Sequence, residues 1–107
     1  MTVPQYTPAN RPRILIVDDY ADARFVWETL LQAAGFDVVT AGTGTEALEK
    51  ALTESLHLVV LDLGLPGSSA VEVARSLRDD DDHRELPLVA LTGQTDPAEL
   101  QRAWDAG

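Results

Sequence analysis

The pattern that decides the fold occurs twice, as Ile14-Leu-Ile-Val-Asp-Asp19 and as Leu58-Val-Val-Leu-Asp62. Each time, a short run of apolar residues ends at an aspartate. Such runs are typical of strands buried on both faces of a parallel sheet. Ligands of open parallel sheets bind outside the carboxyl ends of the strands, so these aspartates stand where chemistry is expected.

Two further apolar runs, Phe36 to Thr40 and Leu88 to Leu91, alternate with segments of helical period. A first helix is expected over about residues 21–34, ending before Gly35, which suits a left-handed cap. Three capping boxes predict the starts of the other helices, at Thr43 to Glu46, Ser69 to Glu72 and Asp96 to Glu99. The alternation predicts four βα units in a doubly wound α/β fold.

Each predicted helix carries an apolar stripe that would face the sheet. The stripes are Ala23, Trp27, Leu30, Leu31 and Ala34 in the first helix, Ala47, Leu48, Ala51 and Leu52 in the second, Val71, Ala74 and Leu77 in the third, and Leu100, Ala103 and Trp104 in the fourth.

The composition limits the class of protein. The 107 residues suffice for one domain, and 18 acidic against 8 basic side chains give a formal charge of -10. This surplus argues against contact with nucleic acid or an anionic membrane surface. No apolar run approaches the roughly 20 residues that span a bilayer, so a cytoplasmic location is expected. Residues 1–12 contain three prolines and are predicted to form a disordered leader.

Three carboxylates, those of Asp18, Asp19 and Asp62, are expected to converge at one edge of the sheet. Neighbouring like charges are unfavourable unless a cation neutralises them. Mg²⁺ fits best, because it takes oxygen ligands and bridges carboxylates to phosphoryl groups. A carboxylate beside Mg²⁺ can also act as a nucleophile and form an aspartyl phosphate. The structural alternative is that Asp19 merely caps the first helix.

These residues resemble the receiver domain of two-component response regulators. The resemblance covers about residues 13–107 and rests on four motifs in order: Ile14-Leu-Ile-Val-Asp-Asp19, Ala41-Gly-Thr-Gly-Thr-Glu-Ala-Leu48, Leu58-Val-Val-Leu-Asp-Leu-Gly-Leu-Pro-Gly67 and Leu88-Val-Ala-Leu-Thr92. It implies a flavodoxin-like sheet with strand order 2-1-3-4. It also implies a phosphoacceptor domain that assists its own phosphorylation and dephosphorylation and is not otherwise an enzyme.

The resemblance assigns roles at the carboxyl edge. Asp62 would accept a phosphoryl group from a phosphohistidine on a histidine kinase or phosphotransfer protein. Asp19 and Asp62 would ligate Mg²⁺, or Mn²⁺ in its place, with Asp18 acting mainly through a metal-bound water. The backbone carbonyl of Gly64 would supply a further oxygen. Thr92, with Gly93 beside it, would bind the phosphoryl oxygens and switch the conformation.

The resemblance also implies partners. Tyr20 and Arg24 lie at the start of the first helix, which would help to dock the kinase. A homodimer is compatible with the family, whereas contact of this domain with nucleic acid or membrane is not expected.

The sequence departs from the family pattern at two places. Ser68-Ser69-Ala70 replaces the usual Met-Asp-Gly type triplet, and Ser69 as an N-cap is a reasonable substitute. The chain also stops at Gly107, before the fifth strand that would carry the family's lysine and switch aromatic. The expected domain over residues 13–107 therefore lacks the fifth strand and helix, and we favour a sequence that has been cut short.

Other functions remain open at this point. The main alternative is a degenerate receiver that works only as an interaction module, independent of phosphorylation. The segment Gly42-Thr-Gly-Thr-Glu-Ala47 also fits a dinucleotide-binding fingerprint, but it follows the second strand instead of the first. A haloacid-dehalogenase-like phosphatase would need a second aspartate where Gly64 stands.

Overall fold

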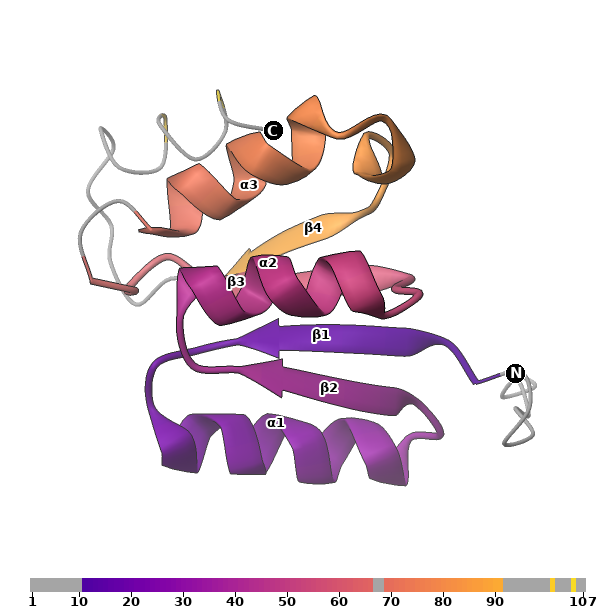
Figure 1. The fold of residues 1–107 in the computed structure, drawn as a ribbon. Coiled ribbons are helices and arrows are strands. Elements are labelled where there is room, and N and C mark those ends of the chain that lie inside the picture. Colours follow the sequence, from indigo (N-terminus) through magenta and orange to yellow (C-terminus); the bar gives the residue numbers. More distant parts are fainter. Residues whose placement is uncertain (1–10, 67–68, 92–100, 102–104, 106–107) are drawn as a thin grey trace.

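The computed structural model describes residues 11–66, 69–91, 101 and 105. The elements in chain order are β1 (Arg13–Val17), α1 (Ala21–Ala33), β2 (Asp37–Ala41), α2 (Gly44–Thr53), β3 (Leu58–Asp62), α3 (Ser69–Asp79), a 3-10 turn η1 (Asp81–His83) and β4 (Leu88–Leu91). The strands form one parallel sheet in the order β2-β1-β3-β4, and their arrowheads point the same way in Figure 1. The predicted fold class and strand order are confirmed.

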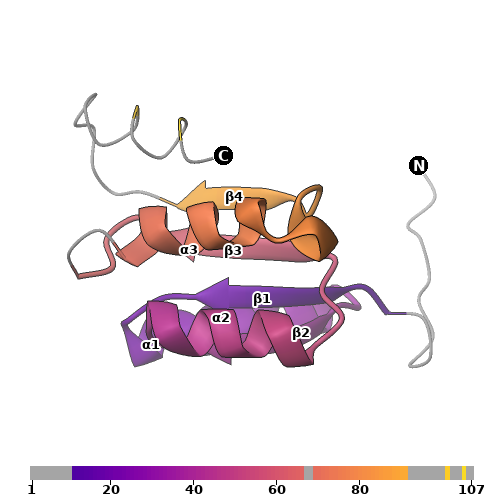
Figure 2. The same cartoon turned by 45° about the horizontal axis from the view of Figure 1, so that its top comes forward.

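Helices cover both faces of this sheet, with α2 and α3 on one side and α1 on the other (Figure 2). Alternation along β1 sorts its side chains between the two faces. Leu15 and Val17 pack with α2 and α3, whereas Ile14 and Ile16 pack beneath Trp27 of α1. The strands are therefore buried on both sides, as their continuous apolar runs predict.

The end of α1 explains why β2 begins one residue later than predicted. Gly35 has a φ of 97°, the left-handed conformation expected of it. The Gly35 N–H donates to the Gln32 carbonyl at 3.0 Å, and the Phe36 N–H donates to the Leu31 carbonyl at 3.0 Å. Phe36 thus closes a Schellman motif and, like Leu31, packs on the core formed by Ile14, Ile16 and Val60, so strand pairing starts only at Asp37.

Three residues of the predicted helix stripes do not face the sheet: Ala34, which is exposed in the C-cap of α1, and two leucines within the helices. Leu30 of α1 is 59% exposed and Leu52 of α2 is 72% exposed. Consecutive helical residues point about 100° apart, and the contact is made by the neighbour in each case. Leu31 packs on the sheet in α1, and the buried Ala51 packs there in α2.

The capping boxes are partly confirmed. The Glu46 N–H donates to Thr43 Oγ1 at 3.1 Å, as predicted, but the Glu46 carboxylate accepts from the Gly42 N–H at 3.2 Å. Helix α3 begins at Ser69 itself, so this residue is the first of the helix and not its N-cap. The box at Asp96 and residues 1–10 of the leader predicted over residues 1–12 lie outside the described residues.

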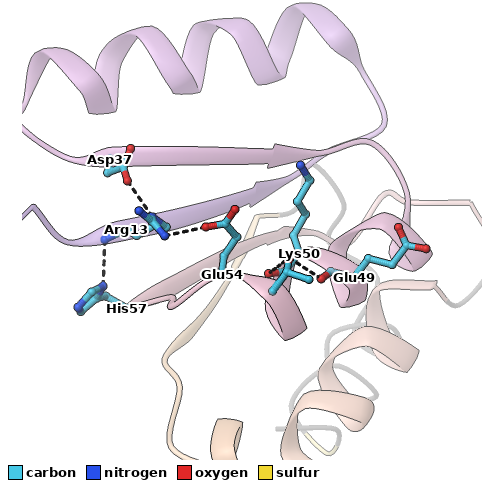
Figure 3. Close-up of polar contacts among 7 residues, drawn as sticks. Arg13, Asp37, Glu49, Lys50, Glu54 and His57 are labelled. Atoms are coloured by element: carbon cyan, nitrogen blue, oxygen red, sulfur yellow. Dashed lines mark hydrogen bonds and ion pairs between the residues drawn. The ribbon is translucent and has the colours of Figure 1, made fainter.

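A cluster of charged residues joins the strands at the edge opposite the predicted site (Figure 3). The Arg13 guanidinium pairs with Asp37 at 2.8 Å and with Glu54 at 2.6 Å. The Arg13 N–H donates to His57 Nδ1 at 3.0 Å, and the His57 N–H donates to the Arg13 carbonyl at 2.8 Å. These contacts tie the beginnings of β1, β2 and β3 together.

Candidate functional site

The three predicted carboxylates lie together at the carboxyl edge of β1 and β3. Val17 pairs in register with Leu61. The next residues along the two strands, Asp18 and Asp62, therefore lie side by side. One carboxylate oxygen from each of Asp18, Asp19 and Asp62 lies within 4.8 Å of the other two. The predicted convergence of these side chains is confirmed.

The cluster is electrostatically unfavourable for the ionised form of Asp62. Burial raises the pKa of Asp62, and the charges of Asp18 and Asp19 raise it further, while a hydrogen bond from the Gly64 N–H opposes the rise. Asp18 is only 8% exposed, whereas Asp62 is half-buried and Asp19 is exposed. The site thus combines a buried acid with two that a ligand can approach.

Local turns orient two of the three carboxylates. Asp18 Oδ1 accepts from the Tyr20 N–H at 2.9 Å, and Asp62 Oδ1 accepts from the Gly64 N–H at 2.8 Å. Aspartate side chains commonly bond the backbone two residues on in this way. Within the described part of the chain the second oxygen of each carboxylate has no N–H donor. It is therefore available to a cation.

The helix-capping alternative for Asp19 is not supported. The N-cap of α1 is Tyr20, whose side chain makes no capping hydrogen bond. Among the described residues no hydrogen bond or ion pair involves the Asp19 carboxylate. Its exposed side chain belongs to the acidic cluster and not to the helix end.

Arg24 and Gly42 meet beside the cluster, a contact that the sequence motifs did not reveal. Arg24 Nη1 donates to the backbone carbonyl of Asp18 at 2.8 Å. A Cβ atom on Gly42 would lie 2.9 Å from this Nη1, which is too close. Only a glycine at this position therefore leaves enough space for the guanidinium group. Two features of the sequence could have indicated this contact: a glycine directly after the second strand and an arginine one turn into the first helix.

The loop after β3 brings Gly64 close to Asp62. A Cβ atom at Gly64 would approach Asp62 Oδ1 to 3.1 Å. The family resemblance implies a role for the Gly64 carbonyl, and the contact observed with Asp62 is made by the Gly64 N–H. The glycine therefore lets its own amide approach the carboxylate.

The remaining predicted residues are placed as follows. Tyr20 is 66% exposed at the mouth of the site. Thr92 and Gly93 lie outside the described residues, but the last residue of β4, Leu91, pairs in register with Asp62.

The donor set fits Mg²⁺. All three side chains offer oxygen, and their mutual repulsion would be relieved by a divalent cation.

None of the helices in the described ranges is long and apolar enough to cross a membrane.

The chain is similar to known proteins over nearly its whole length. Residues 14–107 match the family model described as response regulator receiver domain. The DNA-binding response regulator MtrA of Mycolicibacterium paratuberculosis is 38% identical over 97 residues, which cover 91% of this chain and 42% of that protein. The transcriptional regulatory protein ResD of Bacillus subtilis is 32% identical, with coverage of 92% and 40%. The chain thus spans less than half the length of these curated relatives.

Solved structures agree in fold. The chemotaxis protein CheY4 of Vibrio cholerae superposes with a TM-score of 0.85 at 30% identity, covering 91% of this chain and 81% of that one. The response regulator TrrA of Thermotoga maritima, solved in complex with Mg²⁺ and BeF, gives a TM-score of 0.77 at 33% identity, with coverage of 87% and 79%.

Proposed function

The chain belongs to the response regulator receiver domain family, and from this premise we propose that Asp62 accepts a phosphoryl group in a Mg²⁺-dependent reaction. The observation that carries the proposal is the cluster of Asp18, Asp19 and Asp62 at the edge where parallel sheets bind their ligands. The donor is a phosphohistidine on a histidine kinase or phosphotransfer protein.

The step follows from the position of Asp62. One of its carboxylate oxygens attacks the phosphorus, the P–O bond forms as the P–N bond to the donor imidazole breaks, and the imidazole nitrogen takes up a proton. Phosphoryl transfer needs mainly positioning and charge neutralisation. The bond from the Gly64 N–H to Oδ1 fixes the orientation of the carboxylate, so that it can hold the cation while one of its oxygens attacks.

Mg²⁺ supplies charge neutralisation when it is bound. Asp19 and Asp62 would hold it directly and Asp18 through a water, with the Gly64 carbonyl as a further ligand. The burial of Asp18 and the exposure of Asp19 are consistent with this division. Mn²⁺ has similar ligand preferences and would substitute for Mg²⁺.

The conformational switch is assigned to Thr92, with Gly93 beside it. The register of β4 supports this assignment, because Leu91 lies opposite Asp62 and Thr92 follows it. In the proposal, the Thr92 hydroxyl donates to a phosphoryl oxygen after transfer and so couples phosphorylation to the surface of the protein.

The partner would dock on the outer face of α1, which begins beside the cluster. Tyr20 is exposed there together with Phe25, Val26 and Leu30. The net charge of -10 is consistent with a domain that does not itself contact nucleic acid or anionic membrane. We further propose that the protein is cytoplasmic and that it can form a homodimer. It would assist its own phosphorylation and dephosphorylation and have no other enzymatic activity.

Incubation with Mg²⁺ and acetyl phosphate, followed by intact-mass measurement, tests the phosphoacceptor. We expect the wild type to gain one phosphoryl group, and Asp62→Asn or excess EDTA to abolish the gain. Asp22→Asn, on the exposed first turn of α1, is the matched control and should be labelled like the wild type. No gain by the wild type would contradict the proposal and favour the phosphorylation-independent interaction module.

A further inference from the structure

The side chain of Arg24 lies where the loop after β1 meets the loop after β2. Its Nη1 donates to the Asp18 carbonyl at 2.8 Å, and its guanidinium packs against Gly42. The loop after β1 is also joined to the last residue of β2, because the Asp18 N–H donates to the Ala41 carbonyl at 3.1 Å. One half-buried side chain therefore contacts both loops next to the acidic cluster.

Arg24 occupies a position that disfavours a cation. Its N–H donates to the Tyr20 carbonyl at 3.1 Å, so it stands at the end of the first turn of α1. The partial positive charge of a helix N-terminus opposes a positive side chain there. The contact with the Asp18 carbonyl, beside three carboxylates, offsets this cost.

The carbonyl that Arg24 holds belongs to the peptide between Asp18 and Asp19. The orientation of this peptide sets the spacing and direction of the two side chains that flank it. The Asp18 N–H and Oδ1 are fixed by Ala41 and Tyr20, so the bond from Arg24 completes the fixation of Asp18. Hydrogen bonds from a charged donor are stronger than neutral ones, so the loss of this bond would loosen the peptide.

We propose that Arg24 is a positioning residue that orders Asp18 and Asp19 for Mg²⁺, and that Gly42 provides the space it needs. The proposal rests on the assignment of Mg²⁺ to the acidic cluster. It differs from the docking role predicted for Arg24, because its effect would not depend on a partner protein.

The test is the affinity for Mg²⁺ alone, measured by isothermal titration calorimetry. We expect Arg24→Gln to weaken binding about tenfold or more, the usual effect of removing a residue that orients a metal ligand. Arg24→Lys should restore most of the affinity, because its ammonium can still donate to the Asp18 carbonyl. A purely structural role would lower the unfolding temperature in EDTA without moving the affinity for Mg²⁺.

Gly42→Ala provides the second arm. The added methyl group would displace the flexible guanidinium without disturbing the backbone, so the variant should fold and weaken Mg²⁺ binding as Arg24→Gln does. The double variant should bind no more weakly than Arg24→Gln alone, since both changes remove the same contact. Arg75→Gln removes the same charge from the exposed face of α3 and should leave the affinity unchanged.

Wild-type affinity in Arg24→Gln, or losses that simply add in the double variant, would overturn the proposal. The proposal would also be overturned if the variant bound Mg²⁺ normally and were labelled normally by acetyl phosphate, but were not labelled by a phosphohistidine donor. A docking role for Arg24 predicts that result. The phosphoacceptor proposal fails separately, when a wild type that binds Mg²⁺ takes up no phosphoryl group.

Discussion

Asp62 is held in the cluster at a cost to the fold. Its pKa is raised above the ordinary value of 3.8, first by burial and then by the charges of Asp18 and Asp19. Between the unfolded and the folded pKa the folded protein binds more protons, so stability falls as pH rises through this window. Above the folded pKa the full cost of the ionised carboxylate is present.

Asp62→Asn should therefore raise the unfolding temperature at pH 7 in EDTA, and the gain should disappear as pH falls through the folded pKa to 3.8. Thermal unfolding of both proteins across this pH range measures the difference. Asp22→Asn is a control of opposite sign, because a carboxylate in the first turn of a helix is stabilising. An Asp62→Asn variant less stable than the wild type at pH 7 would contradict the electrostatic account.

At the scale of single residues, the sequence predicted which acids meet but not what orients them. Asp18, Asp19 and Asp62 follow from two strand ends, and strand ends follow from apolar runs. The bond from Arg24 to a backbone carbonyl depends on a side-chain rotamer and on the space above Gly42. Neither the rotamer nor the space above Gly42 produces a periodic pattern in the sequence, so sequence motifs do not predict this contact.

Among the elements, α1 shows how a small backbone motif fixes a boundary. Gly35 adopts a φ of 97°, where an L side chain is strained. We expect Gly35→Ala to lower the free energy of unfolding by about 1–2 kcal/mol, measured by urea denaturation.

Gly44→Ala makes the same chemical change at the first residue of α2, which has no positive φ. Alanine is the better helix former by about 1 kcal/mol, so this variant should be as stable as the wild type or more so. Equal destabilisation by both substitutions would show that the left-handed turn is not the cause.

The outer face of α1 leads to a prediction about the partner. Phe25 is 70% exposed, and Leu52 of α2 is 72% exposed on an element of the opposite face. We expect Phe25→Ala to slow phosphoryl transfer about tenfold, from any phosphohistidine protein that labels the wild type, as loss of an interface anchor does. Labelling by acetyl phosphate should not change.

Leu52→Ala is the matched control, because it removes an equally exposed apolar side chain from another helix. Both rates should stay at the wild-type value in this variant. Equal slowing of transfer by the two substitutions would argue against a docking face on α1.

The two leucines that were wrongly predicted to face the sheet have a common physical cause. Leu30 and Leu52 each follow the helical period, and each lies one residue from the side chain that contacts the sheet. A periodic pattern gives the direction of a stripe but not its width, which depends on how closely the helix packs. The start of α2 was better predicted, because the bond from the Glu46 N–H to Thr43 is local.

For the whole molecule, the order of strands was predictable and their alignment was not. Four apolar runs separated by helices restrict the connections to a parallel sheet, and the family resemblance supplied the order 2-1-3-4 that the structure confirms. The register that sets Val17 against Leu61 arises from packing and from contacts between distant residues. The Arg13 cluster at the far edge is one source of such contacts (Figure 3).

The contact between Arg13 and His57 limits which insertions and deletions strands β1 and β3 can accept. Arg13 and His57 face each other at the beginning of β1 and β3, and Asp18 and Asp62 face each other at the end, after equal numbers of residues. An insertion or deletion in one strand alone would offset the two aspartates by about 3.3 Å and turn one to the opposite face of the sheet. Only matched changes in both strands would keep the carboxylates together, so β1 and β3 can lengthen or shorten only in step.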